Sequence, residues 1–157
     1  MWLANNESTY ATVGIGSAED SYYVGQGEFN PGEDISICKV TAYLSNIAGV
    51  ITGKIFYCQI WTMSGTSLDV LQGESDGVAG SDVIPVDFEF STSVNLSNGT
   101  DYCIVVTMKE VDYSNYARAR VTNAKTGFDG GLGAWNSDKT RQAWYAAFEF
   151  KYDIYTD

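Results

Sequence analysis

The stretch Lys54–Thr62, KIFYCQIWT, changes side-chain character at every second residue. One set is apolar, and the other combines two aromatic rings with an amide. The apolar set is Phe56, Cys58 and Ile60, and the opposite set is Tyr57, Gln59 and Trp61. Successive side chains of a β-strand point to opposite faces of its sheet, so this period of two predicts a strand with one core-facing side.

The same alternation recurs along the chain, between short segments rich in Gly, Asn, Ser and Pro. The alternating stretches are KVTAYLS (39–45), PVDFEF (85–90) and AAFEFKYDIY (146–155). TDYCIVVTM (100–108) is apolar on both faces, which predicts a central, covered strand. The breaks include Ser64–Thr66, the stretch 72–82, Asn98–Gly99 and Gly127–Gly133. Regular spacing of short strands by turns is typical of an antiparallel β-sandwich or barrel with little or no helix. The side chains predicted for the core faces include Phe56, Phe88, Phe90, Phe148 and Phe150.

Composition limits the function. The chain of 157 residues is expected to form one domain (1–157), and its net charge is −11. This charge argues against nucleic acid and anionic membrane as partners. The sequence has no His, which is the commonest general base, and no nucleophile motif, so we expect no enzyme activity. No basic and apolar leader segment is visible at the start of the sequence.

The sequence contains no motif for a metal site or a reactive thiol, and its cysteines and acidic residues allow only general predictions. Cys38, Cys58 and Cys103 lie in strand-like runs without CxxC spacing, which predicts three packed thiols or one disulfide with one free thiol. No cofactor is expected beyond one structural Ca²⁺ held by loop carboxylates, for which the candidates are Asp76, Asp82, Asp129 and Asp138.

Several segments resemble, in the same order, a jelly-roll domain common in bacterial surface proteins and phage structural proteins. Val24–Pro31 (VGQGEFNP) is similar to its VGQSFTP opening with one inserted residue, and Cys38–Ser45 resembles its second strand. Three further stretches resemble the later segments of this domain. They begin at Gly53, span Leu96–Tyr102, and run from Ser114 through Trp144. The resemblance covers about residues 22–152, with 1–21 as a lead-in. It implies an antiparallel jelly-roll β-sandwich of the anchor-type or carbohydrate-binding-module-like kind, in an extracellular or virion setting, with no fixed ligand or catalytic set.

The aromatic residues indicate two candidate sites for a sugar ring. Tyr57, Gln59 and Trp61 share a strand face that is either a surface for stacking and hydrogen bonding or is covered by a loop. A second set lies on YARARV and beside the Gly-rich segment: Tyr116, Arg118, Arg120 and Trp135. Trp135 and Trp144 have the alternative role of plugging the end of the sandwich.

These observations predict non-catalytic binding of a glycan or polysaccharide by a module of a larger secreted or surface protein. The alternative is a structural subunit of a virion, fibre or surface assembly, whose exposed aromatic residues make protein–protein contacts.

Overall fold

The computed structural model describes the backbone of residues 2–4, 11–15, 22–48, 54–79, 85–108, 116–122, 130–145, 149–150 and 152–157. Side chains are described for residues 22–43, 54–79, 85–108, 130–144 and 152–157. These residues form strands and turns and no helix, and their strands pair antiparallel, which confirms the predicted all-β class. Among them no helix is long and apolar enough to cross a membrane.

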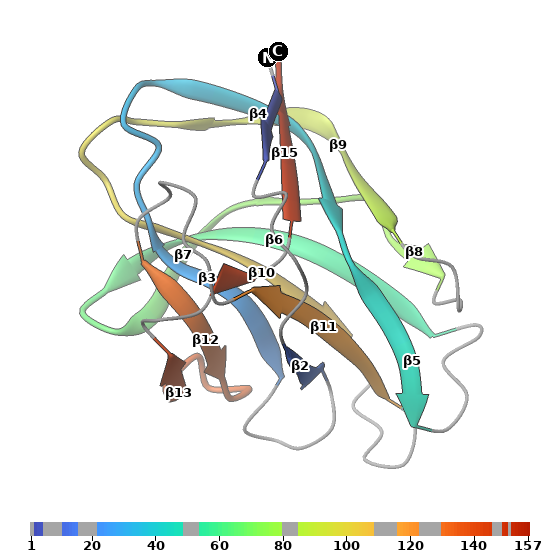
Figure 1. The fold of residues 1–157 in the computed structure, drawn as a ribbon. Coiled ribbons are helices and arrows are strands. Elements are labelled where there is room, and N and C mark those ends of the chain that lie inside the picture. The colour runs from blue at the N-terminus through green and yellow to red at the C-terminus, as the bar shows by residue number, and fades with distance from the viewer. Residues whose placement is uncertain are drawn as a thin grey trace.

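The strands form three sheets (Figure 1). One contains the first and last strands and is called the terminal sheet here; its order is β1-β15-β4-β9. Its strands are β1 (Trp2–Ala4), β15 (Tyr152–Thr156), β4 (Ile35–Ala42) and β9 (Val86–Leu96).

The large sheet has the order β13-β12-β3-β10-β6-β7, with β8 also pairing with β6. Its strands are β13 (Arg141–Tyr145), β12 (Gly131–Trp135), β3 (Tyr23–Phe29), β10 (Tyr102–Met108), β6 (Ile55–Ser64), β7 (Ser67–Glu74) and β8 (Val78–Ala79). The third sheet is built around β11. Its strands are β14 (Glu149–Phe150), β11 (Tyr116–Thr122), β2 (Ala11–Ile15) and β5 (Leu44–Ala48).

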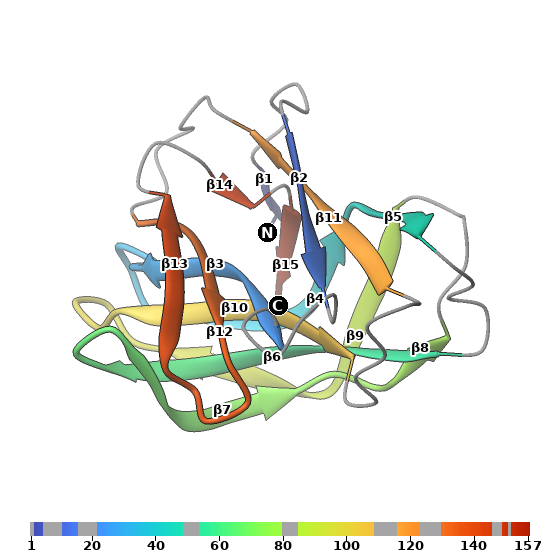
Figure 2. The ribbon, with the colours of Figure 1, turned by 90° about the horizontal axis from the view of Figure 1, so that it is seen from below.

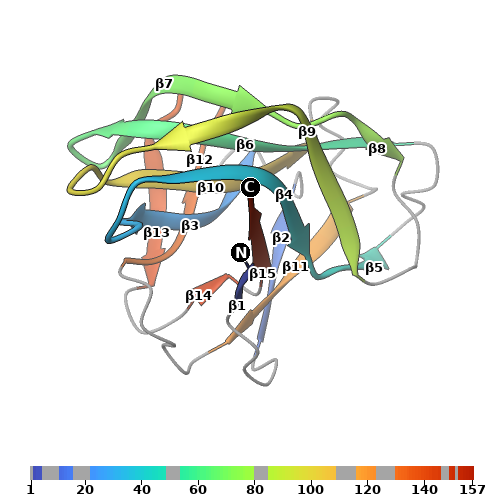
Figure 3. The ribbon, with the colours of Figure 1, turned by 90° about the horizontal axis from the view of Figure 1, so that it is seen from above.

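The main core lies between the terminal sheet and the large sheet. Figure 3 shows β4 and β9 lying over β6 and β10. The terminal sheet contributes Ile37, Phe88 and Tyr152 to this core, and the large sheet contributes Phe56 and Ile60. The two sheets also join directly at one side, where the Asp76 N–H donates to the carbonyl of Glu89 at 2.8 Å. The described strands therefore have the sandwich-like arrangement that the alternation predicts.

The strand predictions hold where alternation is clear. Every residue of β10 is buried, and β10 lies between β3 and β6, which confirms it as a central, covered strand. Phe56, Phe88 and Phe90 are in the core as predicted. Phe148 lies outside the described residues, and the side chain of Phe150 does too.

Two predicted breaks are partly wrong. β7 extends to Glu74 and β8 begins at Val78, inside the Gly/Ser/Asp-rich stretch 72–82. β12 begins at Gly131, inside the predicted Gly-rich break. Gly73 of β7 and Gly133 of β12 therefore lie in strands, and side chains of Val94 and Trp135 occupy the space that a Cβ would fill at these two positions.

Candidate functional site

The predicted β6 face is largely buried. The side chains of Gln59 and Trp61 are 4% and 7% exposed, and Tyr57 is half-buried. The Trp61 indole N–H donates to Oε1 of Gln59 at 2.9 Å, and Nε2 of Gln59 donates to Glu74. Of the two alternatives predicted for this face, the structure therefore shows the covered one for Gln59 and Trp61.

The cover is the β12–β13 hairpin, which pairs with β3 through β12 and passes in front of β10 and β6 in Figure 2. The turn between β12 and β13 is hydrogen-bonded to β7. The N–H of Leu68 in β7 donates to the carbonyl of Lys139 in this turn at 3.1 Å. The ammonium of Lys139 lies 5.2 Å from the centre of the Trp61 ring. Trp61, Trp135 and Leu68 belong to a second buried cluster on this side of the large sheet.

Trp135 is fully buried, which agrees with the alternative that it fills the inside of the sandwich, and its role in binding a ligand stays a prediction. Its indole N–H donates to the carbonyl of Thr66 at 2.9 Å. The ring lies against Gly27 and Gly133, because a Cβ on Gly27 would stand 3.0 Å from Cη2 of Trp135 and one on Gly133 would overlap the same ring. Two strand glycines thus make room for a tryptophan of the second core.

The other predicted ligand residues are not brought to Trp135 by strand pairing. Tyr116, Arg118 and Arg120 lie in β11, which pairs with β2, β5 and β14, whereas Trp135 lies in the large sheet. The segment YARARV forms most of β11. The side chains of β11 lie outside the described residues, and their binding role stays a prediction.

The two calcium candidates that the structure describes, Asp76 and Asp138, lie in different loops. Asp76 accepts a hydrogen bond from Oγ of Ser91 at 2.7 Å, and Asp138 is exposed in the turn between β12 and β13. Asp82 and Asp129 lie outside the described residues. Within the described part of the chain, no three Asp, Glu or Cys side chains gather as a metal site would require.

All three cysteines are free thiols. Cys58 and Cys103 are buried, and burial raises the pKa of the Cys103 thiol to about 12 and that of Cys58 further. Cys38 is half-buried, and its Sγ lies 3.4 Å from the carbonyl oxygen of Tyr155.

Thiol labelling tests this arrangement. Because the thiolate is the reactive form and needs access, a disulfide reagent at neutral pH should modify Cys38 alone in the native protein and all three thiols in denaturant. The native signal should disappear in Cys38→Ser. Labelling of Cys58 or Cys103 at a rate similar to Cys38 would contradict the burial described here.

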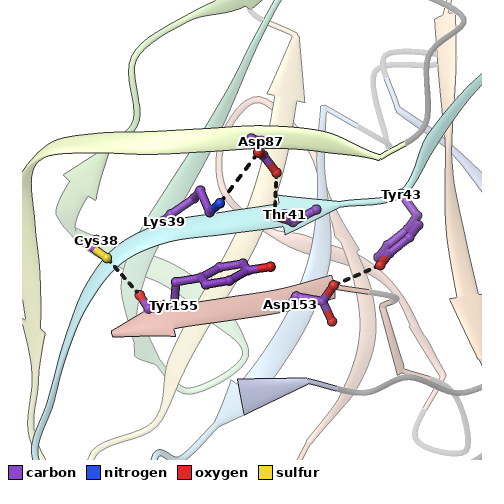
Figure 4. Close-up of polar contacts among 7 residues, drawn as sticks. All are labelled: Cys38, Lys39, Thr41, Tyr43, Asp87, Asp153 and Tyr155. Carbon is purple, nitrogen blue, oxygen red and sulfur yellow. Dashed lines mark hydrogen bonds and ion pairs between the residues drawn. The ribbon is translucent and has the colours of Figure 1, made fainter. Parts of the chain in front are cut away.

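The face of the terminal sheet that points away from the main core carries a different candidate site, named the polar face here (Figure 4), in which Thr41 and Asp153 are buried and Asp87 is half-exposed. It consists of Lys39, Thr41, Tyr43, Asp87, Asp153 and Tyr155, from β4 and the residue after it, β9 and β15. Strand register aligns Asp153, Thr41 and Asp87 in one row across the three strands. The next row contains Tyr155, Lys39 and Glu89. Side chains in such rows share one face of the sheet.

In one half of the polar face, two side chains bind the carboxylate of Asp87. The hydroxyl of Thr41 donates to Oδ1 of Asp87 at 2.5 Å, and Nζ of Lys39 lies 3.5 Å from Oδ2. The same ammonium lies 4.0 Å from the centre of the Tyr155 ring, a cation–π contact. Asp87 is half-exposed, so this half carries a carboxylate that solvent or a ligand can reach.

In the other half of the polar face, Tyr43 binds the carboxylate of Asp153. The phenol of Tyr43 donates to Oδ2 of Asp153 at 2.8 Å (Figure 4). Burial, followed by the hydrogen bond to Asp153, raises the pKa of Tyr43 to about 12. Tyr43 therefore stays a protonated donor at neutral pH and fixes one carboxylate oxygen.

The described part of the terminal sheet also contains a cavity of about 500 Å³ at the end of β4, β9 and β15. Its apolar lining is Ile35 and Leu96, and its polar lining is Ser36, Asn95, Ser97, Thr156, Glu33, Asp34 and Asp157. Asp34 accepts a hydrogen bond from the N–H of Asn98, and Asp157 accepts one from Ser36. Hydrogen bonds from Ser93 and then Ser36 lower the pKa of Asp157. The cavity is thus rich in hydroxyl and carboxylate oxygens.

Sequence reasoning did not single out the polar face, although its signal was present. In KVTAYLS, Thr41 and Tyr43 alternate with Val40 and Ala42, and Asp153 lies between Tyr152 and Ile154. Alternation marks these side chains as facing away from the core, but it does not say that β4, β9 and β15 are neighbours. That knowledge requires pairing between strands far apart in the sequence.

No protein-family model matches this chain, and a search of curated protein sequences finds no match.

Proposed function

We propose that this domain is a non-catalytic carbohydrate-binding module and that the polar face holds the sugar. The observation that supports it is the row of hydrogen-bonding groups formed by Asp153, Thr41 and Asp87, beside the half-buried Tyr43 and Tyr155. A sugar presents hydroxyl groups that donate and accept, together with apolar C–H patches. Carboxylates, hydroxyls and aromatic rings on one sheet face match both properties.

The charge of the region favours polyhydroxylated ligands over phosphates and sulfates. Glu33, Asp34 and Asp157 line the cavity at the end of the same sheet, and Lys39 is paired with Asp87. The resemblance to surface and phage domains is consistent with a secreted or virion-associated setting, in which such a module would belong to a larger parent protein.

Affinity electrophoresis through gels that contain single polysaccharides tests the proposal. We expect at least one neutral or amine-bearing polysaccharide to retard the protein. The double variant Tyr155→Ala/Asp87→Asn should bind several-fold more weakly, because an aromatic contact is worth on the order of 1 kcal/mol. The matched control is Asp69→Asn, which makes the same charge change at an exposed position of β7.

Melting curves must show that all variants are folded. If no polysaccharide retards the wild type, or if the double variant is retarded equally, the polar face is not a glycan site.

One observation favours the alternative of an assembly subunit. Val70 and Leu71 are 54% and 41% exposed on β7, at the edge of the large sheet. Exposed apolar residues on an edge strand are a common place for contacts between chains. Light scattering over a concentration series would favour this function if it showed an oligomer that Val70→Asp dissociates.

A further inference from the structure

The guanidinium of Arg141 in β13 has hydrogen-bond donors that no described residue uses. Its side chain is 19% exposed, and its Nη1 is buried and makes no hydrogen bond. Nη1 lies 3.5 Å from Oε1 of Glu28, which is an ion pair but is longer than the usual hydrogen bond. A buried donor without an acceptor is rare in folded proteins and calls for an explanation.

The backbone of Glu28 has a conformation that glutamate rarely adopts. Its φ is 53°, in the left-handed region. The register of β3 against β10 shifts at this point, so that Gly27 and Glu28 together lie opposite Cys103. A bulge of this kind redirects a side chain, and strained residues cluster at binding sites. Here the side chain that the bulge carries lies against Arg141.

An aromatic ring lies beside this pair. Trp144 is half-buried in β13, and Cζ of Arg141 lies 4.4 Å from the centre of its ring. The ring lies over Gly27, because a Cβ there would stand 2.8 Å from Cζ3 of Trp144. Glu28, Arg141 and Trp144 are named the hairpin-edge site here. Solvent reaches this site, since the Glu28 side chain is 42% exposed and Gln142 is exposed.

We propose that the hairpin-edge site is a second site for a neutral sugar, so that one domain holds a polysaccharide at two places. This inference rests on the proposed function, since it takes the same class of ligand. Each sugar hydroxyl both donates and accepts, so two adjacent hydroxyls can donate to Glu28 and accept from Arg141. The C–H groups of the sugar pack on the ring of Trp144. Phosphates, sulfates and uronic acids are disfavoured, because Glu28 already balances the charge of Arg141.

Affinity electrophoresis through gels that contain xylan, β-glucan or galactomannan tests this site. In the gel that retards the wild type, Arg141→Met should bind about tenfold more weakly, because hydrogen bonds to charged groups are the stronger ones. Arg141→Lys keeps the charge, loses the planar fork of donors and should weaken binding as well, which provides the test if Arg141→Met does not fold. The matched control is Lys139→Met, which removes one positive charge from the same hairpin outside the site and should bind like the wild type. Melting curves show which variants are folded.

The polar-face variant Tyr155→Ala/Asp87→Asn separates this inference from the proposed function. With two sites, this variant should keep part of its retardation and lose it when Arg141→Met is added. If the Arg141 variants bind like the wild type, or no more weakly than Lys139→Met, the second site is overturned and the polar face is unaffected. If the Arg141 variants bind weakly and the polar-face variant binds like the wild type, the hairpin-edge site stands and the polar face is overturned. Absence of retardation of the wild type in all gels would overturn both.

Discussion

Trp135→Ala is expected to lower the free energy of unfolding by about 3–5 kcal/mol, the usual cost of truncating a large buried aromatic side chain. Trp135 is fully buried, and its indole N–H donates to the carbonyl of Thr66 at 2.9 Å. The substitution removes one of the two indole rings of the second core, and with it a hydrogen bond that holds β12 to the turn between β6 and β7. Urea unfolding followed by circular dichroism measures the loss.

Trp135→Phe is the matched control, because it keeps an aromatic ring and loses the bond to Thr66. It should cost clearly less than Trp135→Ala. If Trp135→Ala costs less than about 0.5 kcal/mol, as is usual for exposed positions, Trp135 is at the surface and the described cover of Trp61 is wrong.

Gly25→Ala should prevent folding or cost about 3 kcal/mol or more, at the upper end of the range for overpacking. Gly25 lies in β3 between β10 and β12. A Cβ at this position would overlap the carbonyl oxygen of Ile104 and stand 2.7 Å from Cα of Val105. Both obstacles are backbone atoms of the paired strand, which can move only if the pairing of β3 with β10 is disturbed.

Gly99→Ala is the comparison. Gly99 has a φ of 80° in the turn before β10, and a Cβ there would meet no atom within 4 Å. Its cost should be about 1–2 kcal/mol, the strain of a left-handed backbone conformation in an L-residue. If the two alanine variants are equally stable in thermal unfolding, the close approach of β3 and β10 at Gly25 is not as described.

The sequence was sufficient to predict individual strands where one face is apolar and the other polar. Alternation located β4, β6 and β9 and placed Phe56 and Phe88 in the core, because burial on one side of a strand imposes a period of two. The apolar run of β10 identified it as covered on both faces. These features depend on neighbours within one strand, which a sequence records directly.

The candidate site could not be predicted in the same way, because it depends on which strands become neighbours. Trp61 is covered by the turn after Trp135, more than seventy residues later in the chain. Alternation alone does not say whether the β6 face is exposed or covered. The position of the β12–β13 hairpin over Trp61 decides between the two alternatives. The sequence likewise marks the residues of the polar face as pointing away from the core. It does not show that the pairing of β15 with β4 and of β4 with β9 brings these residues together.

The most direct test of the central claim is a nuclear magnetic resonance titration of the isotopically labelled protein with a soluble oligosaccharide of the polysaccharide that retards it in the gel. If the polar face binds sugar, the amide signals that shift should include those of β4, β9 and β15, around Thr41, Asp87 and Asp153. Shifts concentrated on β6 and β12 around Trp61 and Trp135, or no shifts at all, would contradict the assignment of sugar binding to the terminal sheet.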